Sequence, residues 1–432
     1  MQPLPGFRDF LPEACATRNY IFARWREVAR RYGFVEWDGP VLEPTELYKK
    51  KSGDEIVGQL FNFTDKGDRE VAMRPELTPT LARVVAANER AFKKPLKWFS
   101  IPQCFRYEKQ QRGRLREHFQ LNCDIIGEMS IEADIELIAL AIDLLRAFGF
   151  NAGDVIVRIS DREFWTDFLK TRDVSQERWP EILQAIDKSE RDPREKTAAR
   201  LGDLAAPIFE ILEKGSRSER LDKVMEGLRV RGLADFAAVD VQIVRGLAYY
   251  TGIVFEVFDR AGKFRAIAGG GRYDNLIAQL SDGAVSLPAL GFAIGDVVLG
   301  ELIREVPAAL AQLEESTQTE NATEIYAVVA KEERRGDALA VVQQLRDRGW
   351  RVDYSLVAAK IGKQFQTAEH LGARTAVLFG DEWPEVAVKN LATGEQQLVA
   401  GDALVAHLAM LPSLSSRAQR SGVEGPRGEI RT

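Results

Sequence analysis

Residues 105–124 read Phe105-Arg106-Tyr107-Glu108-Lys109-Gln110-Gln111-Arg112-Gly113-Arg114-Leu115-Arg116-Glu117-His118-Phe119-Gln120-Leu121-Asn122-Cys123-Asp124 and predict two strands joined by a basic loop. The first strand is expected to end near Glu108, and the second to begin near Arg116. Because side chains alternate along a strand, the second strand would have one polar and one apolar face. Its polar side chains are those of His118, Gln120, Asn122 and Asp124.

A polar strand face is often simply the solvated side of an antiparallel sheet. The loop before this strand, however, contains Arg112, Arg114 and Arg116. Arginine side chains bind phosphate oxygens in a bidentate manner. The combination therefore favours binding of a polyanion, such as a triphosphate, over a face that is merely wet.

The composition predicts a folded protein of two or three domains in a reducing compartment. The chain has 432 residues, of which 45% are hydrophobic, and its three cysteines (Cys15, Cys104 and Cys123) form no CxxC pattern. We expect buried thiols rather than disulfides or a zinc site. Neither a secretory signal nor an apolar run long enough to span a bilayer is found, which indicates a cytoplasmic protein with no membrane partner. With a net charge of -6, the chain would meet any RNA through local basic patches.

The first third of the chain predicts helices and short strands around the opening stretch. Apolar residues at helical spacing predict a helix over 17–33, and 40–44 is an extended segment that suits a sheet edge or a subunit contact. Residues 61–65 and 71–74 predict a hairpin. A helix is expected to follow Arg74, and Glu76 and Thr78 near its start would most simply cap it.

The rest of the chain predicts a helix over 131–148, a charged helical insertion over 161–238, and a return to strands over 241–256, 266–274 and 289–298. The triple glycine Gly269-Gly270-Gly271 marks a bulge or a place where a ligand approaches the backbone. Residues 307–322 are expected to be a linker. Alternating strands and helices over 323–411 predict a small α/β domain with a largely parallel sheet, and 412–432 predict a disordered tail.

In this order, the segments resemble a class II aminoacyl-tRNA synthetase, and specifically the histidyl-tRNA synthetases. Pro40 lies in a segment similar to motif 1, 105–127 resembles motif 2, and 291–300 occupies the place of motif 3. Residues 245–252 and 270–274 resemble the two histidine-specific signatures. The resemblance implies an α+β fold whose antiparallel sheet is flanked by helices. Residues 1–160 and 239–306 would form the catalytic domain, 161–238 the helical insertion, and 323–411 an anticodon-binding-like α/β domain.

The function implied is that of a histidine–tRNA ligase, with L-histidine, ATP, Mg²⁺ and tRNA(His) as its partners and a homodimer as its working form. The histidine carboxylate would attack the α-phosphorus of ATP, and the terminal ribose of tRNA would then attack the mixed anhydride. No protein nucleophile is needed, so His118, His370 and His407 need not be catalytic.

The resemblance also assigns roles in the nucleotide site. Arg106 would hold the α-phosphate of ATP, Glu108 the adenine amino group, and Arg114 the outer phosphates. Arg245 would reach the α-phosphate from the opposite side, which makes Arg106 and Arg245 the catalytic pair. These roles agree with charge logic, because negative charge that develops in a transition state is best met by preorganised cations.

For the amino acid, Glu76, Thr78 and Gln120 would take the α-amino group, and Asp124 and Tyr250 would bracket the imidazole. Arg245, Tyr249 and Tyr273 complete the implied histidine site. A carboxylate and a hydroxyl can match both ring nitrogens, and ligands lacking them would leave a buried charge unpaired. For tRNA, the implied contacts are Lys360, Lys363 and Arg374, although plain solvation is the simpler explanation of each.

Three positions depart from the commonest pattern of the family. Val298 stands where motif 3 usually has an arginine, His118 stands where a phenylalanine stacks on adenine, and Ala248 replaces an aspartate. We expect a branch similar to the plant organellar type, which lacks the motif 3 arginine, to share these changes. The ligands of magnesium are left open.

Two other functions remain open at this point. One is a histidine-binding regulatory subunit of ATP phosphoribosyltransferase, although that paralogue typically lacks the C-terminal domain. The other is a catalytically silent, dimeric RNA-binding module, which would fit if Val298 abolishes ATP use.

Overall fold

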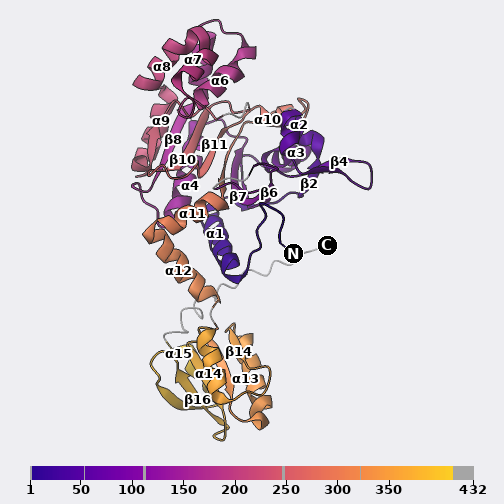
Figure 1. Ribbon diagram of the computed structural model, residues 1–432, viewed down its shortest axis with the longest axis vertical. Coiled ribbons are helices and arrows are strands. Elements are labelled where there is room, and N and C mark those ends of the chain that lie inside the picture. The colour runs from indigo at the N-terminus through magenta and orange to yellow at the C-terminus, as the bar shows by residue number, and fades with distance from the viewer. Residues whose placement is uncertain (1, 53, 110–112, 246–248, 322, 412–432) are drawn as a thin grey trace. The chain divides into compact units, whose positions relative to one another are not determined.

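The computed structural model describes residues 2–52, 54–109, 113–245, 249–321 and 323–411, which form two compact units (Figure 1). The first unit extends to Thr317 and the second begins at Gln318. This boundary falls inside helix α12 (Pro307–Asn321), where the sequence analysis expects a linker. The segment is helical because its Ala, Leu, Glu and Gln residues favour helix and because Ala309 and Leu313 are buried in the core of the first unit.

The first unit is built on a nine-stranded sheet in the order β1-β5-β7-β12-β11-β10-β8-β9, with β6 paired to the start of β7. Neighbouring strands are antiparallel except at the two ends, where β1 pairs with β5 and β8 with β9 in parallel. The strands are β1 (Val35–Glu36), β5 (Leu96–Ser100), β6 (Gln103–Phe105), β7 (Glu117–Ile126), β8 (Val155–Asp161), β9 (Ala237–Val239), β10 (Ile253–Asp259), β11 (Ala268–Arg272) and β12 (Ala289–Gly295).

The two predicted strands around the basic loop are β6 and β7, and they pair in antiparallel fashion with Phe105 opposite Glu117. The first strand ends at Phe105, three residues earlier than expected. The predicted alternation along β7 is confirmed, because Leu121, Cys123 and Ile125 all belong to the main hydrophobic core. The polar face is not solvated, since Gln120, Asn122 and Asp124 are buried as well.

Four helices cover the apolar face of β7 and its neighbours and contribute to the same core. They are α1 (Pro12–Arg31), α4 (Ile131–Arg146), α9 (Glu219–Val230) and α11 (Asp296–Glu305). The predicted helices over 17–33 and 131–148 correspond to α1 and α4. Cys104 and Cys123 are buried, whereas Cys15 on α1 is only partly buried, so the expectation of three buried thiols is wrong for Cys15.

A second layer lies beside β5 and β12. The predicted hairpin is confirmed, because β3 (Asn62–Thr64) pairs with β4 (Glu70–Met73), and β2 (Leu42–Pro44) extends it to a three-stranded sheet. Three helices, α2 (Thr45–Ser52), α3 (Thr78–Ala87) and α10 (Leu276–Leu280), pack together near it. Leu81 and Val85 of α3 and Leu276 of α10 share a small core with Leu96 and Tyr273.

The expected helical insertion consists of two parts. Helices α5 (Arg162–Lys170), α6 (Trp179–Asp187), α7 (Arg194–Leu201) and α8 (Ala205–Lys214) form a core of their own around Trp165. Helix α9 packs instead on α4 and on the main core. Figure 1 shows α6, α7 and α8 gathered at one end of the first unit, next to α9.

The strand predicted from residue 241 begins only at Ile253. Val241 and Val244 are apolar because they pack against the core of α5–α8, and a turn at Asp240 directs the chain there. A buried contact with a neighbouring helical module therefore produced a strand-like pattern. Residues 246–248 lie outside the described residues.

The second unit contains the predicted alternation of strands β13 (Ile325–Val329), β14 (Val352–Tyr354) and β15 (Thr375–Phe379) with helices α13 (Arg335–Asp347) and α14 (Ile361–His370). These three strands are parallel. The prediction missed the antiparallel strands β16 (Glu385–Asn390) and β17 (Gln396–Ala400), which a turn with Gly394 at φ 77° connects, and helix α15 (Leu404–Met410). The sheet is therefore mixed.

Two further expectations concern the C-terminal tail and membrane-spanning helices. The tail predicted over 412–432 lies outside the described residues. Within the described residues, none of the helices has both the length and the apolar composition needed to cross a bilayer.

Candidate active site

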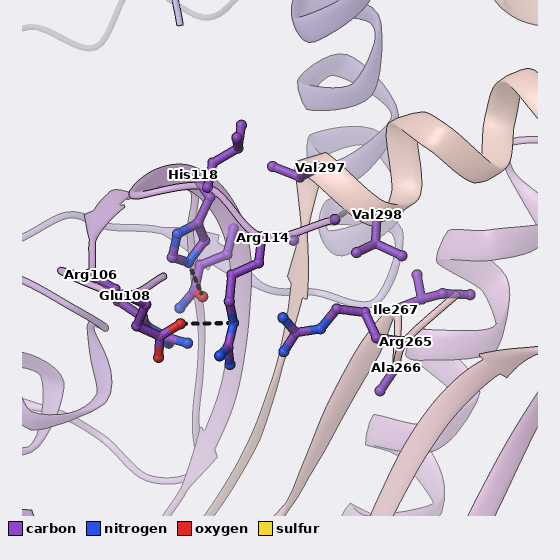
Figure 2. Close-up of a pocket in the computed structure, with 13 residues that line it drawn as sticks. Arg106, Glu108, Arg114, His118, Arg265, Ala266, Ile267, Val297 and Val298 are labelled. Atoms are coloured by element: carbon purple, nitrogen blue, oxygen red, sulfur yellow. Dashed lines mark hydrogen bonds and ion pairs between the residues drawn. The ribbon is translucent and has the colours of Figure 1, made fainter. Parts of the chain in front are cut away.

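Two adjoining cavities lie along the polar face of β7. The first has a volume of about 150 Å³ and is enclosed by the loop between β6 and β7, the segment before β11 and the start of α11 (Figure 2). It is lined by four of the residues that the sequence analysis assigned to ATP, namely Arg106, Glu108, Arg114 and His118, whereas Arg245 lines the second cavity. The structure therefore brings these four side chains to one place.

The second cavity has a volume of about 90 Å³ and collects every residue assigned to histidine. These are Glu76, Thr78, Gln120, Asp124, Arg245, Tyr249, Tyr250 and Tyr273. Asn122, which the sequence analysis placed on the polar face without a role, also lines it, and the Gln120 amide donates to Asn122 Oδ1 over 2.8 Å. Arg106 and Gln120 line both cavities, so the two sites meet at these residues.

Asp124 lies at the floor of the second cavity and is 3% exposed. Burial raises the pKa of Asp124 to about 7, although the Tyr273 hydroxyl, which donates to Asp124 Oδ1 over 2.5 Å, acts in the opposite direction. The hydrogen-bond partner of the Asp124 side chain is therefore Tyr273. Gly291 of β12 stands opposite Asp124, and a Cβ atom at Gly291 would overlap the carboxylate.

The expected capping role of Glu76 and Thr78 is wrong. Helix α3 begins at Thr78 with Leu77 as its N-cap, and no side chain caps it. Glu76 instead forms an ion pair with Lys51, whose Nζ lies 2.5 Å from Glu76 Oε1. Burial alone would raise the pKa of Glu76, but Lys51 outweighs it and brings the pKa below its ordinary value.

Lys51 is a cavity neighbour that the sequence analysis missed. Its side chain is 1% exposed, and its ammonium lies 4.1 Å from the centre of the Tyr249 ring, a cation–π contact. The run Lys49-Lys50-Lys51 is typical of a solvated surface. The available signal was helical spacing, because Lys51 lies three and four residues after the buried Tyr48 and Leu47.

Arg245 enters the second cavity from an unusual backbone conformation, with φ at 57°. Its guanidinium is held by Glu256 of β10, with Nη1 2.8 Å from Oε1, and lies 5.4 Å from the centre of the Tyr250 ring. Gly269 of β11 pairs with Glu256, and a Cβ atom at Gly269 would collide with Nη1 of Arg245. The triple glycine thus forms no bulge at this position and makes room for a side chain.

In the first cavity, Glu108 and Arg114 are engaged with each other, with Arg114 Nε 2.7 Å from Glu108 Oε2 (Figure 2). Both implied roles require this ion pair to open when ATP binds. The ring of His118 donates to Gln120 Oε1 over 3.3 Å. Burial, and then the guanidinium of Arg106, lower the pKa of His118 to about 3, so its ring is neutral at physiological pH.

Arg8 connects two walls of the first cavity and was not predicted. Its Nε lies 2.6 Å from Glu117 Oε1 at the start of β7, and its Nη1 lies 2.9 Å from Asp296 Oδ2 at the start of α11. Asp296 also accepts the backbone N–H of Phe119. This network fixes the start of α11, and with it Val298, against β7. Of the other residues singled out, Arg112 and Ala248 lie outside the described residues.

In the second unit, Lys360 and Lys363 are exposed at the start of α14. Arg374 follows the other end of the same helix, which over 10 residues is about 15 Å long. The structure therefore places the two lysines together and Arg374 apart from them.

Comparisons with known proteins show which family the chain matches. A family model described as histidyl-tRNA synthetase matches residues 6–296, and one described as anticodon binding domain matches 324–410. The histidine–tRNA ligase of Opitutus terrae is 45% identical over 417 residues, covering 90% of this chain and 92% of the relative. The chloroplastic/mitochondrial histidine–tRNA ligase of Arabidopsis thaliana is 40% identical, covering 92% of this chain and 84% of the relative.

Solved structures show the same fold. The histidyl-tRNA synthetase from Nostoc superposes with a TM-score of 0.76, at 24% identity, over 98% of this chain and 99% of that chain. A Bacillus halodurans structure titled ATP phosphoribosyltransferase regulatory subunit/histidyl-tRNA synthetase gives a TM-score of 0.67 at 21% identity, over 88% of this chain and 98% of that chain. At these identities, the likeness extends to the fold alone.

We predict that Gly291→Ala and Gly269→Ala separate two properties of the site. Gly291→Ala displaces the Asp124 carboxylate and should weaken histidine binding roughly tenfold or more, because a buried hydrogen-bonded group is lost. Gly269→Ala displaces Arg245 and should leave histidine affinity much closer to normal. Gly295→Ala, on the same strand as Gly291 but with open space around its Cβ, is the matched control. Equal histidine affinity in all three variants, measured by calorimetric titration, would contradict the assignment of Asp124.

We also predict that, without added histidine, Asp124 makes the protein less stable as the pH rises. Its pKa is about 7 in the folded chain and about 4 in an unfolded one, so the folded state retains a proton that the unfolded state releases. This stabilisation is fully present below about pH 4 and is lost towards pH 7. In urea unfolding of the first unit, the free energy of unfolding of Asp124→Asn should therefore rise relative to that of the parent between pH 5 and 7. A pH-independent difference between the two proteins would refute the raised pKa.

Proposed function

This chain belongs to the histidyl-tRNA synthetase family and acts as a histidine–tRNA ligase, and we propose that its two adjoining cavities divide the substrates of the activation step between them. ATP occupies the first cavity and histidine the second. The observation that carries this division is that Arg106 and Gln120 line both cavities. A carboxylate in one cavity and an α-phosphate in the other must meet at such a junction.

In the activation step, a carboxylate oxygen of histidine attacks the α-phosphorus, and the bond to the leaving pyrophosphate breaks. Arg106, whose Nε donates to the Pro75 carbonyl over 3.0 Å, and Arg245, held by Glu256, are the fixed cations at this point. Preorganised cations stabilise the negative charge that develops on the phosphoryl oxygens. The terminal ribose hydroxyl of tRNA then attacks the activated carbonyl, and AMP leaves.

Histidine is recognised by groups at both ends. Asp124, oriented by Tyr273, takes one imidazole nitrogen, and the nearby Tyr250 hydroxyl takes the other. The α-amino group binds Glu76, Thr78 and Gln120. Glu76 is already ionised, because it forms an ion pair with Lys51. The incoming ammonium takes over part of this ion pair, and Glu76 does not have to lose a proton on binding.

The adenine ring is held by Glu108 and His118 in this proposal. A neutral imidazole presents a flat ring face without the repulsion that a charged one would exert on Arg106, which suits His118 to stack on adenine. Val298, which is 7% exposed, can offer only apolar contact from the position of the motif 3 arginine. The departures from the common pattern therefore leave a usable, rearranged nucleotide pocket.

Magnesium would arrive with the triphosphate as part of the substrate. The described residues provide no group of three or more metal-ligating side chains. Glu108 is the carboxylate that lines the first cavity, and it is paired with Arg114. These donors do not fit a resident metal site, so we assign no step to one.

The second unit is proposed to bind tRNA(His), because its residues 324–410 match an anticodon-binding family model. Lys360 and Lys363 at the start of α14 are the contacts that we favour. The homodimer is also a proposal, supported by the exposed apolar side chains of Val35, Val41, Leu42 and Phe63 near the segment similar to motif 1. Sedimentation of the purified chain tests it. From the family assignment, we also propose that the protein is cytoplasmic.

The regulatory-subunit alternative has no feature of its own in its favour. The curated relatives described above are all named histidine–tRNA ligases. The nucleotide cavity keeps Arg106, Glu108 and Arg114 together, which a histidine sensor without ATP chemistry does not need.

The function predicts histidine-dependent exchange between ATP and pyrophosphate. Its absence in purified protein that still binds histidine would favour the regulatory alternative. In the same assay, Arg245→Ala should reduce the exchange rate roughly 100-fold or more, because a transition-state cation is lost. Histidine affinity should change much less. An unchanged rate in Arg245→Ala would refute its assigned role.

The proposed tRNA contact predicts a separate effect. Charge reversal in Lys360→Glu combined with Lys363→Glu should weaken tRNA binding and lower the rate of aminoacylation at low tRNA concentration, because phosphate contacts are lost. Exchange between ATP and pyrophosphate should be unchanged. Arg374→Glu, at the other end of α14, is the matched control, and an equal loss with that variant would contradict the assignment.

A further inference from the structure

The first cavity contains one arginine to which the family resemblance assigns no role. Arg265 lies in the segment between β10 and β11, and its side chain extends into the cavity from the wall opposite the β6–β7 loop (Figure 2). Figure 2 shows the guanidinium group of Arg265 extending across the cavity toward the side chain of Arg114. Two cations from separate elements thus converge on one space.

Arg265 has no hydrogen bond or ion pair with any described residue, whereas Arg114 is paired with Glu108 and Arg245 with Glu256. The charges that act on it are mostly cationic. Burial, and then the guanidinium of Arg114, lower the pKa of Arg265, and Glu108 offsets only part of this. Like charges held together are unfavourable unless an anion lies between them. The first cavity therefore has an excess of positive charge that a polyanion would neutralise.

The place of Arg265 matters because of Val298. A Cβ atom built on Gly113 would lie 3.1 Å from Val298 Cγ2 and 3.7 Å from Arg265 Cδ, so the two side chains border the same small space. Val298 occupies the position at which the family pattern has an arginine. Arg265 thus reaches, from a different strand connection, the part of the cavity beside the position where the motif 3 cation is missing.

We propose that Arg265 is a substrate-binding residue that, with Arg114, clamps the β- and γ-phosphates of ATP. Its guanidinium donates to non-bridging oxygens of these phosphates, and it stays with pyrophosphate when the bond to the α-phosphorus breaks. The proposal rests on the proposed function, since it requires ATP in the first cavity. It assigns Arg265 to the outer phosphates and not to adenine or histidine.

The test compares nucleotides that differ in their phosphates. In Arg265→Ala, the dissociation constants of Mg–ATP and of pyrophosphate should rise roughly 10- to 100-fold, as expected for losing a charge-assisted contact. The dissociation constants of AMP and of histidine should change little. Lys263→Ala is the matched control. It removes a cation from the same segment, but Lys263 pairs with Glu305 at the surface. Arg265→Lys should fall between the parent and Arg265→Ala.

A rescue variant adds a second measurement. Val298→Arg, introduced into Arg265→Ala, should recover part of the affinity for ATP and pyrophosphate, because it restores a cation beside the same space. Val298 is buried, so if the double variant does not fold, the nucleotide series of Arg265→Ala decides alone. An AMP affinity that falls as much as that of ATP, or an ATP affinity that does not change, would overturn the proposal.

Direct binding titrations keep this inference separate from the proposed function. If the parent protein shows no histidine-dependent exchange but binds Mg–ATP through Arg265, the ligase function fails and the clamp stands. If exchange is normal in the parent and Arg265→Ala binds all nucleotides as the parent does, the clamp fails and the ligase function stands.

Discussion

The pairing of β7 with β12 is the constraint on which the site depends. Opposite Gln120, Asn122 and Asp124 of β7 stand Gly295, Ala293 and Gly291 of β12. Gly291 leaves the space into which Asp124 extends, because a larger residue there would overlap its carboxylate. Polar groups removed from water need partners, and here Tyr273 and the Gln120–Asn122 hydrogen bond provide them. A strand without chemistry of its own thus determines where the chemistry can occur.

The other face of β7 gives this arrangement its rigidity. Leu121, Cys123 and Ile125 are locked in the main core against α4 and its neighbours, so the polar side chains between them have little freedom to move. Arg8 extends the same rigidity to the nucleotide cavity by joining the start of β7 to the start of α11. Binding groups held by a packed core need little reorganisation during the reaction, which is a main source of electrostatic catalysis.

Sequence reasoning recovered what is encoded locally. The alternation along β7 predicted its polar face, and the family resemblance assigned most of the other side chains that line the two cavities. Contacts between distant segments were missed, because no period or motif encodes them: Lys51 with Glu76, Arg245 with Glu256, and Arg8 with Asp296. The strand predicted from Val241 was wrong for a related reason. Val241 and Val244 are apolar because they pack against the core of α5–α8, and this gives the sequence a strand-like pattern. The hairpin β16–β17 was missed because it departs from the α/β alternation: β16 follows β15 with no helix between them.

The raised pKa of Asp124 has a consequence for the traffic of protons. In the proposed complex, the Asp124 carboxyl and the imidazole of the substrate form a buried pair with no net charge when they share one proton beyond that of the neutral ring. Near pH 7 the free carboxyl is about half protonated, and a free histidine ring, with a pKa of about 6.5, is protonated in part. The two partners therefore bring most of that proton with them. Histidine binding should therefore take up or release few protons, and it would hardly change the protonation of the surrounding buffer.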